Sequence, residues 1–282
     1  MQAEIYDDRR CELGEGPLWH PRRKQLFWFD ILGKRMLSRR GDVVQSWEFD
    51  RYVSAASWAD HDVLVLATET DICQLDLTTD QMTRIAPLDA DSPNTRSNDA
   101  RADPYGGFWI GTMGKSAELN HGAIHRYYRG EIRKLIAPLT IPNAISFAPD
   151  GSVAYYADTA VGKVWRQPLD RHGWPKGSAD VFIDHGPDGG PDGAVVDGQG
   201  MLWNAHWGHF KVSVYDQAGN LMRDLRLPAR QPSCPAFGGP GLNRLFVTTA
   251  REHLGDDASD HDGVTYAFDT DVRGQEEHQV IL

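Results

Sequence analysis

The segment from Pro142 to Trp203 contains one sequence unit twice. The first copy, residues 143–151, reads NAISFAPDG and leads into the apolar run SVAYY. The second copy, residues 192–200, reads DGAVVDGQG and leads into MLW. Each copy begins with an oxygen-bearing side chain, Asn143 or Asp192, and passes through a Gly-containing turn into a short aromatic run. Such repetition is typical of a fold built from equivalent units.

Further copies of this unit lie before the pair. Residues 98–109 read NDARADPYGGFW, and a more divergent copy, EGPLWHP, begins at Glu15. Equivalent anchor positions about 40–50 residues apart divide the chain into six units, and this period is typical of propeller blades. The anchors are Glu15, Ser54, Asn98, Asn143, Asp192 and Cys234.

Within each unit the pattern is that of β-structure. Short runs rich in β-branched and aromatic residues, such as LFWF at 26–29 and VLVL at 63–66, alternate with turn sequences that contain Asp-Gly or Gly-Gly. No segment shows sustained helical periodicity. We therefore predict an all-β protein, a six-bladed β-propeller with four-stranded antiparallel blades around a central channel. Residues 1–282 are expected to form a single domain.

The composition argues against several classes of function. The net charge is −11, and no cationic cluster exceeds Arg22-Arg23-Lys24, whereas nucleic-acid binding requires clustered cations. No apolar run approaches the ~20 residues of a membrane span, and the N-terminus lacks the apolar core of a signal peptide. The three cysteines contain no CxxC pair and are expected to be free thiols in a reducing cytoplasm. No obligate protein partner is evident.

In a propeller, residues at the starts of the innermost strands meet around the channel mouth. The predicted ring contains Glu15, Asn143 and Asp192, which offer two carboxylates and a carboxamide oxygen. This hard-oxygen set suits one divalent metal ion: Ca²⁺, Mg²⁺, Mn²⁺ or, less predictably, Fe(II) or Zn²⁺. Gly residues on both sides of Glu15 would let the chain pack closely around it. Any one of these residues could instead satisfy local backbone groups in a turn.

Four stretches of the chain resemble the senescence-marker-protein/gluconolactonase/luciferin-regenerating-enzyme family. They are LGEGPLW at 13–19, RSNDARADP at 96–104 with GTM at 111–113, PNAISFAPDG at 142–151 and PDGAVVD at 191–197. The segment from Cys234 onward is most similar to the bacterial sugar-lactonase branch, including pentonolactonases. One departure is Ala144, where the family often has Gly. This difference should matter little, provided that the position does not need a positive φ.

The resemblance implies that Glu15, Asn143 and Asp192 bind one divalent metal and that Arg96 and Asn98 contact the substrate. It also implies hydrolysis of a small-molecule sugar (aldono) lactone, a pentono- or hexonolactone, to the aldonic acid. Asp192 would then act catalytically as the proton acceptor as well as a ligand. The repeat pattern alone does not select Arg96, whose alternative role is a surface charge paired with an aspartate.

Other functions stay open at this point. The chain has no Gly-x-Ser-x-Gly motif, which argues against a covalent serine mechanism. The alternatives are a calcium-dependent esterase or phosphotriesterase-type hydrolase, whose site should be apolar, and a non-enzymatic calcium-binding propeller. His206 and His209 could bind a metal from their loop, line the mouth or pack between blades, and Glu118 could cover the site as a lid.

Overall fold

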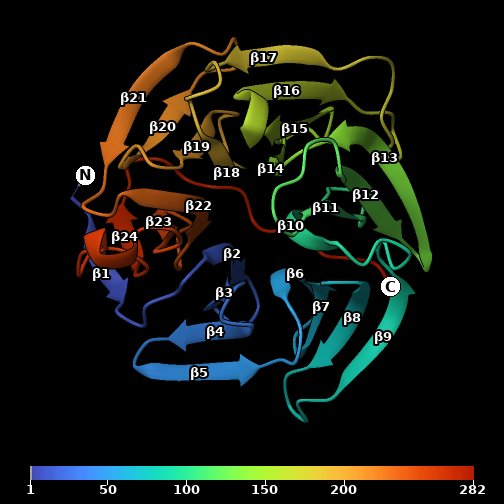
Figure 1. The fold of residues 1–282 in the computed structure, drawn as a ribbon, viewed down its shortest axis with the longest axis horizontal. Coiled ribbons are helices and arrows are strands. Elements are labelled where there is room, and N and C mark those ends of the chain that lie inside the picture. The colour runs from blue at the N-terminus through green and yellow to red at the C-terminus, as the bar shows by residue number, and fades with distance from the viewer. Residues whose placement is uncertain (1) are drawn as a thin grey trace.

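Six four-stranded antiparallel sheets form a ring in the computed structural model, which describes residues 2–282 (Figure 1). The predicted all-β, six-bladed propeller is therefore confirmed. The helices of the described residues are two short 3₁₀ turns, η1 (Thr159–Val161) and η2 (Gly255–Asp257). Neither has the length and hydrophobicity needed to cross a membrane.

Blades 1 to 5 each contain four consecutive strands, with the first strand nearest the axis. Blade 1 contains β2 (Gly14–His20), β3 (Gln25–Asp30), β4 (Arg35–Arg40) and β5 (Val43–Glu48). Blade 2 contains β6 (Val53–Asp60), β7 (Val63–Thr68), β8 (Asp71–Asp76) and β9 (Met82–Pro87). Blade 3 contains β10 (Thr95–Ala102), β11 (Phe108–Gly114), β12 (Gly122–Tyr128) and β13 (Glu131–Leu139). Blade 4 contains β14 (Pro142–Phe147), β15 (Val153–Asp158), β16 (Lys163–Pro168) and β17 (Asp180–Asp184). Blade 5 contains β18 (Pro191–Val196), β19 (Leu202–His206), β20 (Lys211–Tyr215) and β21 (Leu221–Arg226).

Blade 6 combines strands from both ends of the chain. Its inner strands are β22 (Gln231–Gly238), β23 (Arg244–Ala250) and β24 (Thr265–Asp269), and its outer strand is β1 (Glu4–Asp7). Antiparallel pairing of β1 with β24 closes the ring, so the first strand completes the last blade. Closure of this kind protects sheet edges that would otherwise pair with other chains.

The recurring aspartates of the repeat close the turn that follows each inner strand. Asp103 accepts hydrogen bonds from two backbone amides of its own turn and from Trp109 Nε1 at 3.1 Å. Asp197 does the same in blade 5, where Trp203 Nε1 donates at 2.9 Å. Both indole rings are fully buried. The repeated sequence thus encodes a capped turn and an anchored tryptophan in each of these blades.

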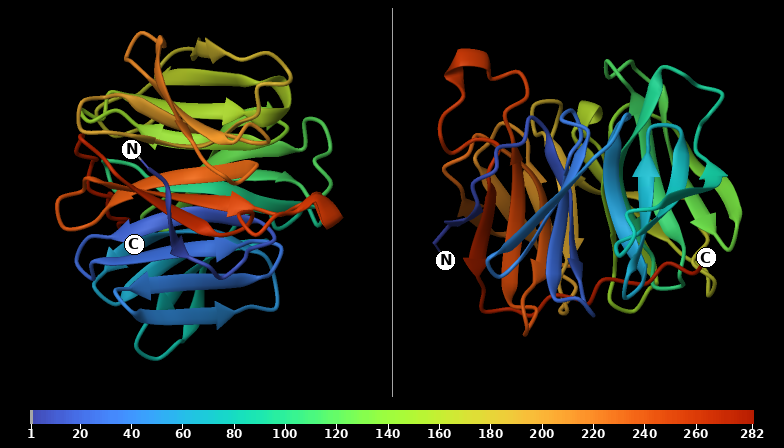
Figure 2. Two further views of the ribbon diagram at one scale, coloured as in Figure 1. Left: turned by 90° about the vertical axis from the view of Figure 1, so that its left-hand side faces the viewer. Right: turned by 90° about the horizontal axis from the view of Figure 1, so that it is seen from below.

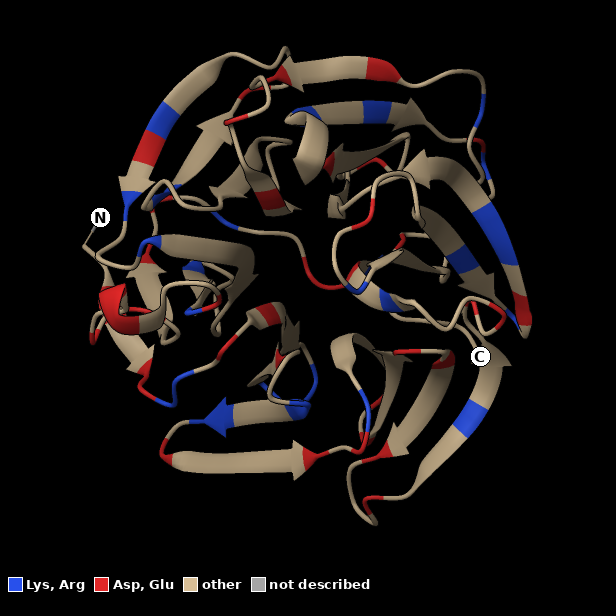
Figure 3. Cartoon of the chain, viewed as in Figure 1, with Lys and Arg blue, Asp and Glu red and all other residues tan. Residues whose placement is uncertain are grey.

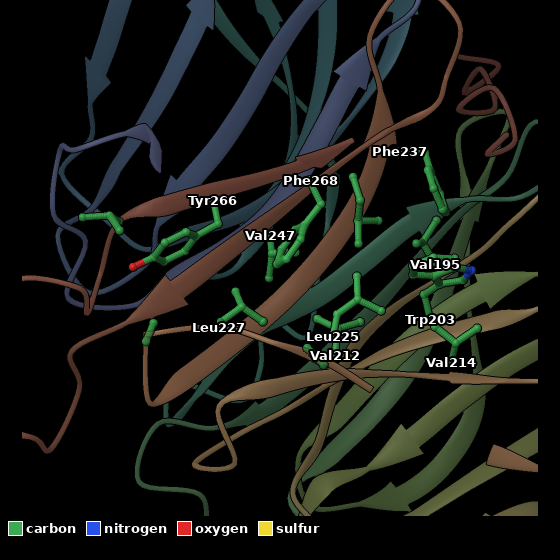
Figure 4. Packing of buried hydrophobic residues seen from close by; sticks show 14 residues of the cluster. Val195, Trp203, Val212, Val214, Leu225, Leu227, Phe237, Val247, Tyr266 and Phe268 are labelled. Atoms are coloured by element: carbon green, nitrogen blue, oxygen red, sulfur yellow. The ribbon is translucent and has the colours of Figure 1, made fainter. Parts of the chain in front are cut away.

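Apolar side chains fill the spaces between neighbouring blades. Figure 4 shows the cluster between blades 5 and 6, where Trp203 and Phe237 meet edge to face with ring centroids 5.2 Å apart. The inner strands are buried along their length, whereas outer strands such as β5 and β9 are largely exposed. Figure 3 shows Lys and Arg spread over the outer strands of several blades. The inner strand starts are therefore held rigidly around the axis.

Candidate functional site

All six anchors lie in innermost strands, one per blade, as the repeat predicts. Glu15, Asn143 and Asp192 each occupy the second position of their strands, β2, β14 and β18. Asn98 lies at the fourth position of β10. Glu15 and Asp192 are only 5% and 4% exposed, and Asn98 and Asn143 are buried as well. The structure therefore brings the predicted site residues to the same end of the inner strands.

A break in strand register follows each of these side chains. Pairing shifts between Glu15 and Leu18 in β2 and between Asn143 and Ser146 in β14. Such β-bulges bend a strand and redirect a side chain, and they are frequent next to active sites. Breaks in register therefore occur at the same place in these inner strands, beside the predicted site residues.

The bulges require unusual backbone angles. Gly16 has φ +55°, and a Cβ at this position would collide with the Ser54 carbonyl, as expected from the close packing predicted around Glu15. Ala144 has φ +58°. The expectation that Ala at position 144 matters little was conditional on an ordinary φ, and that condition is not met. An L-residue in the left-handed region costs roughly 1–2 kcal/mol, so Ala144 stores local strain beside Asn143.

A chain of hydrogen bonds connects the amide and guanidinium groups of the site. Arg96 Nη1 donates to Asn98 Oδ1 at 2.9 Å, and Asn98 Nδ2 donates to Asn143 Oδ1 at 2.9 Å. Asn143 Nδ2 donates to Thr159 Oγ1 at 2.8 Å, and that hydroxyl donates to the Pro191 carbonyl at 2.7 Å. The network thus runs across blades 3, 4 and 5 and ends one residue before Asp192. It fixes the orientation of both amides.

Two buried carboxyl groups lie close to Arg96 of this network, and they affect each other: a hydrogen bond from Asp192 lowers the pKa of Glu15, whereas the Glu15 charge raises the pKa of Asp192. Burial raises the pKa of Glu15 to about 8; the charge of Asp99 adds to the shift, while the Gly16 amide and Arg96 oppose it. Burial also raises the pKa of Asp192 well above its usual range, with the Glu15 charge as the next largest cause. Like charges in a low-dielectric site disfavour double ionisation. A cation between these groups would remove that cost.

Arg96 is buried in the site and is not a surface charge. Burial lowers the pKa of its guanidinium, and the carboxylates of Glu252, Glu15 and Asp192 oppose the shift. Asp103, which could have paired with it, instead contacts Arg126. Arg96 therefore contacts Asn98, the other residue that the family resemblance assigns to the substrate. Glu252 and Thr159 were not identified from the sequence, because they lie in loops after β23 and β15, outside the repeated unit.

The remaining ring positions hold the blades together. Ser54 Oγ donates to Ser97 Oγ at 2.8 Å across blades 2 and 3, and Ser233 Oγ donates to the Gly14 carbonyl across blades 6 and 1. Cys234 is buried on the axis as a free thiol, and Cys11 and Cys73 are free and buried too. The expectation of three unpaired thiols is confirmed. Ser54 and Ser233 thus form contacts between neighbouring blades.

The histidines and Glu118 are engaged elsewhere. His206 Nδ1 donates to the Gly189 carbonyl at 2.8 Å, and His209 Nε2 donates to the Asp188 carbonyl at 2.8 Å. Both histidines therefore bind backbone of the loop before β18. Glu118 Oε2 accepts from the Ser116 amide at 3.0 Å, so its carboxylate closes its own loop. Among residues 2–282, no group of three or more His, Cys, Asp or Glu side chains is arranged to hold a metal.

A site of two carboxylates and one amide oxygen is a different donor set, and it fits a hard divalent cation. Glu15 and Asp192 would contribute two negative charges, whose mutual repulsion the cation would offset, and Asn143 would contribute a neutral oxygen. Thr159 accepts a hydrogen bond from Asn143 Nδ2 and so fixes the orientation of this amide, as groups that hydrogen-bond to metal ligands commonly do. The residues present therefore fit the predicted metal.

Comparisons with known proteins identify the family of the chain. The chain is 37% identical to a putative sugar lactone lactonase of Rhizobium meliloti (strain 1021), over 98% of this chain and 96% of that protein. It is 36% identical to the L-arabinolactonase of Azospirillum brasilense, over 91% and 87% of the two chains. A crystal structure from Agrobacterium tumefaciens, described as a calcium-binding protein, regucalcin, superposes with a TM-score of 0.97 at 38% identity, covering 100% and 98%. The SMP-30/Gluconolactonase/LRE-like region matches residues 13–251, and the chain therefore belongs to this family.

Proposed function

We propose that the protein hydrolyses a sugar lactone to the corresponding aldonic acid, using one divalent metal ion bound by Glu15, Asn143 and Asp192. The observation that carries this proposal is the pair of buried carboxyl groups, Glu15 and Asp192, whose pKa values are raised above all by burial. Groups with such perturbed pKa values in a polar cleft are typical of functional sites. A structural ring would be stabilised by neutral side chains at these positions instead.

The residues of the site supply the groups that ester hydrolysis needs. A bound divalent cation would act as a Lewis acid toward the lactone carbonyl. Asp192 accepts the proton of the attacking water as the water oxygen bonds to the carbonyl carbon, and the ring C–O bond then breaks. The same proton passes to the ring oxygen, which becomes the hydroxyl of the aldonic acid. Arg96, fixed by Asn98, faces the charge that develops on the carbonyl oxygen.

The polarity of the site favours a polyhydroxylated substrate. Guanidinium, amide and carboxylate groups surround the position of the proposed metal, and sugar hydroxyls can pair with all three. The relatives include an L-arabinolactonase and a pentonolactonase of Haloferax volcanii, the latter 32% identical. These names support a pentono- or hexonolactone as the substrate class. An esterase or phosphotriesterase with hydrophobic substrates would require an apolar lining.

A substrate screen tests the proposal. The purified protein, stripped of metal and reloaded with single divalent ions, is assayed by pH indicator against pentono- and hexono-1,4- and 1,5-lactones and a long-chain acyl lactone. We expect turnover of at least one aldonolactone above its spontaneous opening and none of the acyl lactone. Turnover of the acyl lactone alone would favour the esterase-type hydrolase.

Matched variants tie the activity to the site. Glu15→Gln, Asn143→Ala and Asp192→Asn should each abolish turnover, whereas Ser54→Ala, from the same ring but bonded to Ser97, should retain it. Equal activity in all four variants would contradict the proposal. We also place the protein in the cytoplasm, since its three cysteines are free thiols, and its recovery in the cytoplasmic fraction of fractionated cells tests this.

The Agrobacterium tumefaciens structure supports a second candidate, a calcium-binding propeller without catalysis. Under that function the same three residues would hold Ca²⁺, and the variants would lose calcium binding. A wild-type protein that binds Ca²⁺ tightly and hydrolyses no lactone of the panel with any ion would support this candidate.

A further inference from the structure

The last described residues cross the end of the propeller opposite the site. This strap, residues 273–281, leaves blade 6 where Gly274 N donates to the Leu242 carbonyl at 2.7 Å. It then passes blade 5 and reaches blades 2 and 3, where Val280 N and Ile281 N donate to the carbonyls of Trp58 and Gly106. Figure 1 shows it crossing the middle of the ring, and Figure 2 (right) shows it at one end, with the η2 loop at the other. The strap therefore closes the channel.

One side chain of the strap enters the channel. Glu277 Oε1 pairs with Arg101 Nη1 of β10, and their side chains are only 8% and 10% exposed. The backbone carbonyl of Glu277 accepts from Trp58 Nε1 at 2.8 Å, so the residue is fixed at both ends. A charged pair this deeply buried needs further polar partners, because desolvation of two ions is costly. The further partners of Arg101 lie in β14 and β18.

Arg101 also donates two hydrogen bonds to the strands that carry the site. Its Nε donates to the Ile145 carbonyl at 3.2 Å, and its Nη2 donates to the Ala194 carbonyl at 3.3 Å. Ile145 and Ala194 lie two residues after Asn143 and Asp192, in β14 and β18. A guanidinium group is planar and rigid, so its bonds fix the relative position of the groups that accept them. Arg101 therefore bridges these two strands close to the site, while Gln275 of the strap bridges their far ends by donating from Nε2 to the carbonyls of Phe147 and Val196 at 3.0 and 2.9 Å.

Asp99, also in β10, binds the backbone amide of Ile145, whose carbonyl binds Arg101. Its Oδ2 accepts from the Ile145 amide at 2.7 Å, so both polar groups of the Ile145 peptide are bound by side chains of β10. A small cavity on the axis is lined by Asp99, Arg101, Cys234 and Glu277, and it separates the strap from the site. Glu277 of the strap and Asp99 and Arg101 of β10 therefore line the same cavity.

We infer that Glu277 is a positioning residue for the metal site: through Arg101 it sets the spacing of β14 and β18, and hence of Asn143 and Asp192. The inference rests on the proposed function, because it concerns the same three ligands. It differs from a merely stabilising role of the strap, which would change the melting temperature and leave the affinity for a divalent ion as it is.

The test compares two substitutions in the strap. Glu277→Gln keeps the length of the side chain and removes its charge, whereas Gln279→Ala removes a contact with the Ala59 carbonyl away from the axis. Metal-free wild type and both variants are titrated with Mn²⁺ by calorimetry at 25 °C, and their melting is recorded without metal. We expect the Kd for Mn²⁺ to rise at least tenfold in Glu277→Gln and less than twofold in Gln279→Ala.

The outcomes separate the two proposals. If wild type binds Mn²⁺ and Glu277→Gln binds it equally well, the positioning role is wrong, whatever happens to the melting temperature. If both variants weaken binding equally, the strap acts only through general stability, and the positioning role is again wrong. If wild type binds no divalent ion, the proposed metal site itself is wrong and the inference is overturned with it. Should Glu277→Gln not fold, Glu277→Asp, which keeps the charge and shortens the reach, takes its place in the same comparison.

Discussion

The raised pKa of Glu15 makes the stability of the metal-free protein depend on pH in an unusual direction. In the unfolded chain a glutamate ionises near pH 4.5, whereas in the fold Glu15 ionises at about 8. Between these values the folded state binds the extra proton, so stability is greatest below the unfolded pKa and is lost as pH rises through the folded pKa. Glu15→Gln removes this titrating group at nearly constant shape and should remove the part of the loss that Glu15 causes, while the raised pKa of Asp192 leaves the variant a loss of its own.

The size of the effect follows from the two pKa values. One bound proton changes stability by about 1.4 kcal/mol per pH unit. With a folded pKa of about 8, wild type should lose roughly 1 kcal/mol between pH 7 and pH 8 relative to Glu15→Gln. His20, His185 and His206, whose pKa values are lowered to about 4 by burial, favour the opposite trend at lower pH. Their contributions are common to both proteins and cancel in the difference.

The assay is urea unfolding in a chelator at pH 7.0, 7.5 and 8.0, for wild type, Glu15→Gln and Glu131→Gln. Glu131 is an exposed carboxylate paired with Arg133, so its variant should keep the wild-type pH dependence. Addition of a divalent ion at 100 times its Kd should stabilise wild type by about 2.7 kcal/mol and Glu15→Gln by less. Parallel pH profiles of wild type and Glu15→Gln would refute the buried carboxyl pair.

Three further changes have defined outcomes. Ala144→Gly should raise the free energy of unfolding by about 1 kcal/mol in urea unfolding, because φ +58° is strained for Ala, and an unchanged or lower stability would contradict that strain. Asp103→Asn should lower the free energy of unfolding by about 3–5 kcal/mol, because the buried Arg126 loses its charged partner. Asp150→Asn, in the exposed turn of blade 4, should have a far smaller effect, and equal losses in the two variants would contradict the role of Asp103 as a turn anchor. Thr159→Val should reduce kcat/KM for the lactone about tenfold without loss of folding, since Asn143 loses its hydroxyl partner, and wild-type kinetics would rule out this role.

The repeat predicted the fold and most of the ring because its signals are local. Asp197 and Trp203 lie six positions apart in sequence, and together they define a turn and a buried anchor in one blade. The same repeated pattern predicted that Asn98, Asn143 and Asp192 occupy equivalent positions in their blades. Arg96 required the family resemblance, because it lies two residues before its anchor and nothing in the repeat distinguishes it from a surface charge.

The contacts between segments far apart in the chain could not be predicted from the sequence. Nothing in the pattern pairs β1 with β24, or Glu277 with Arg101 across 176 positions, because neither segment belongs to the repeated unit. The backbone at Ala144 was also not foreseen, since its positive φ follows from a bulge whose register depends on the neighbouring strand. Glu252 reaches Arg96 and Asp192 only because the ring brings blades 6, 3 and 5 around one axis.

The central claim is that Glu15, Asn143 and Asp192 bind the metal with which the protein opens a sugar lactone. The most direct test measures bound metal and the rate of hydrolysis of the aldonolactone that the screen identifies, on the same samples of wild type and Asp192→Asn, before and after chelation. We expect about one divalent ion per wild-type chain, activity that disappears on chelation and returns with the ion, and neither metal nor activity in Asp192→Asn. Full activity in the chelated wild type, or in Asp192→Asn, would contradict it.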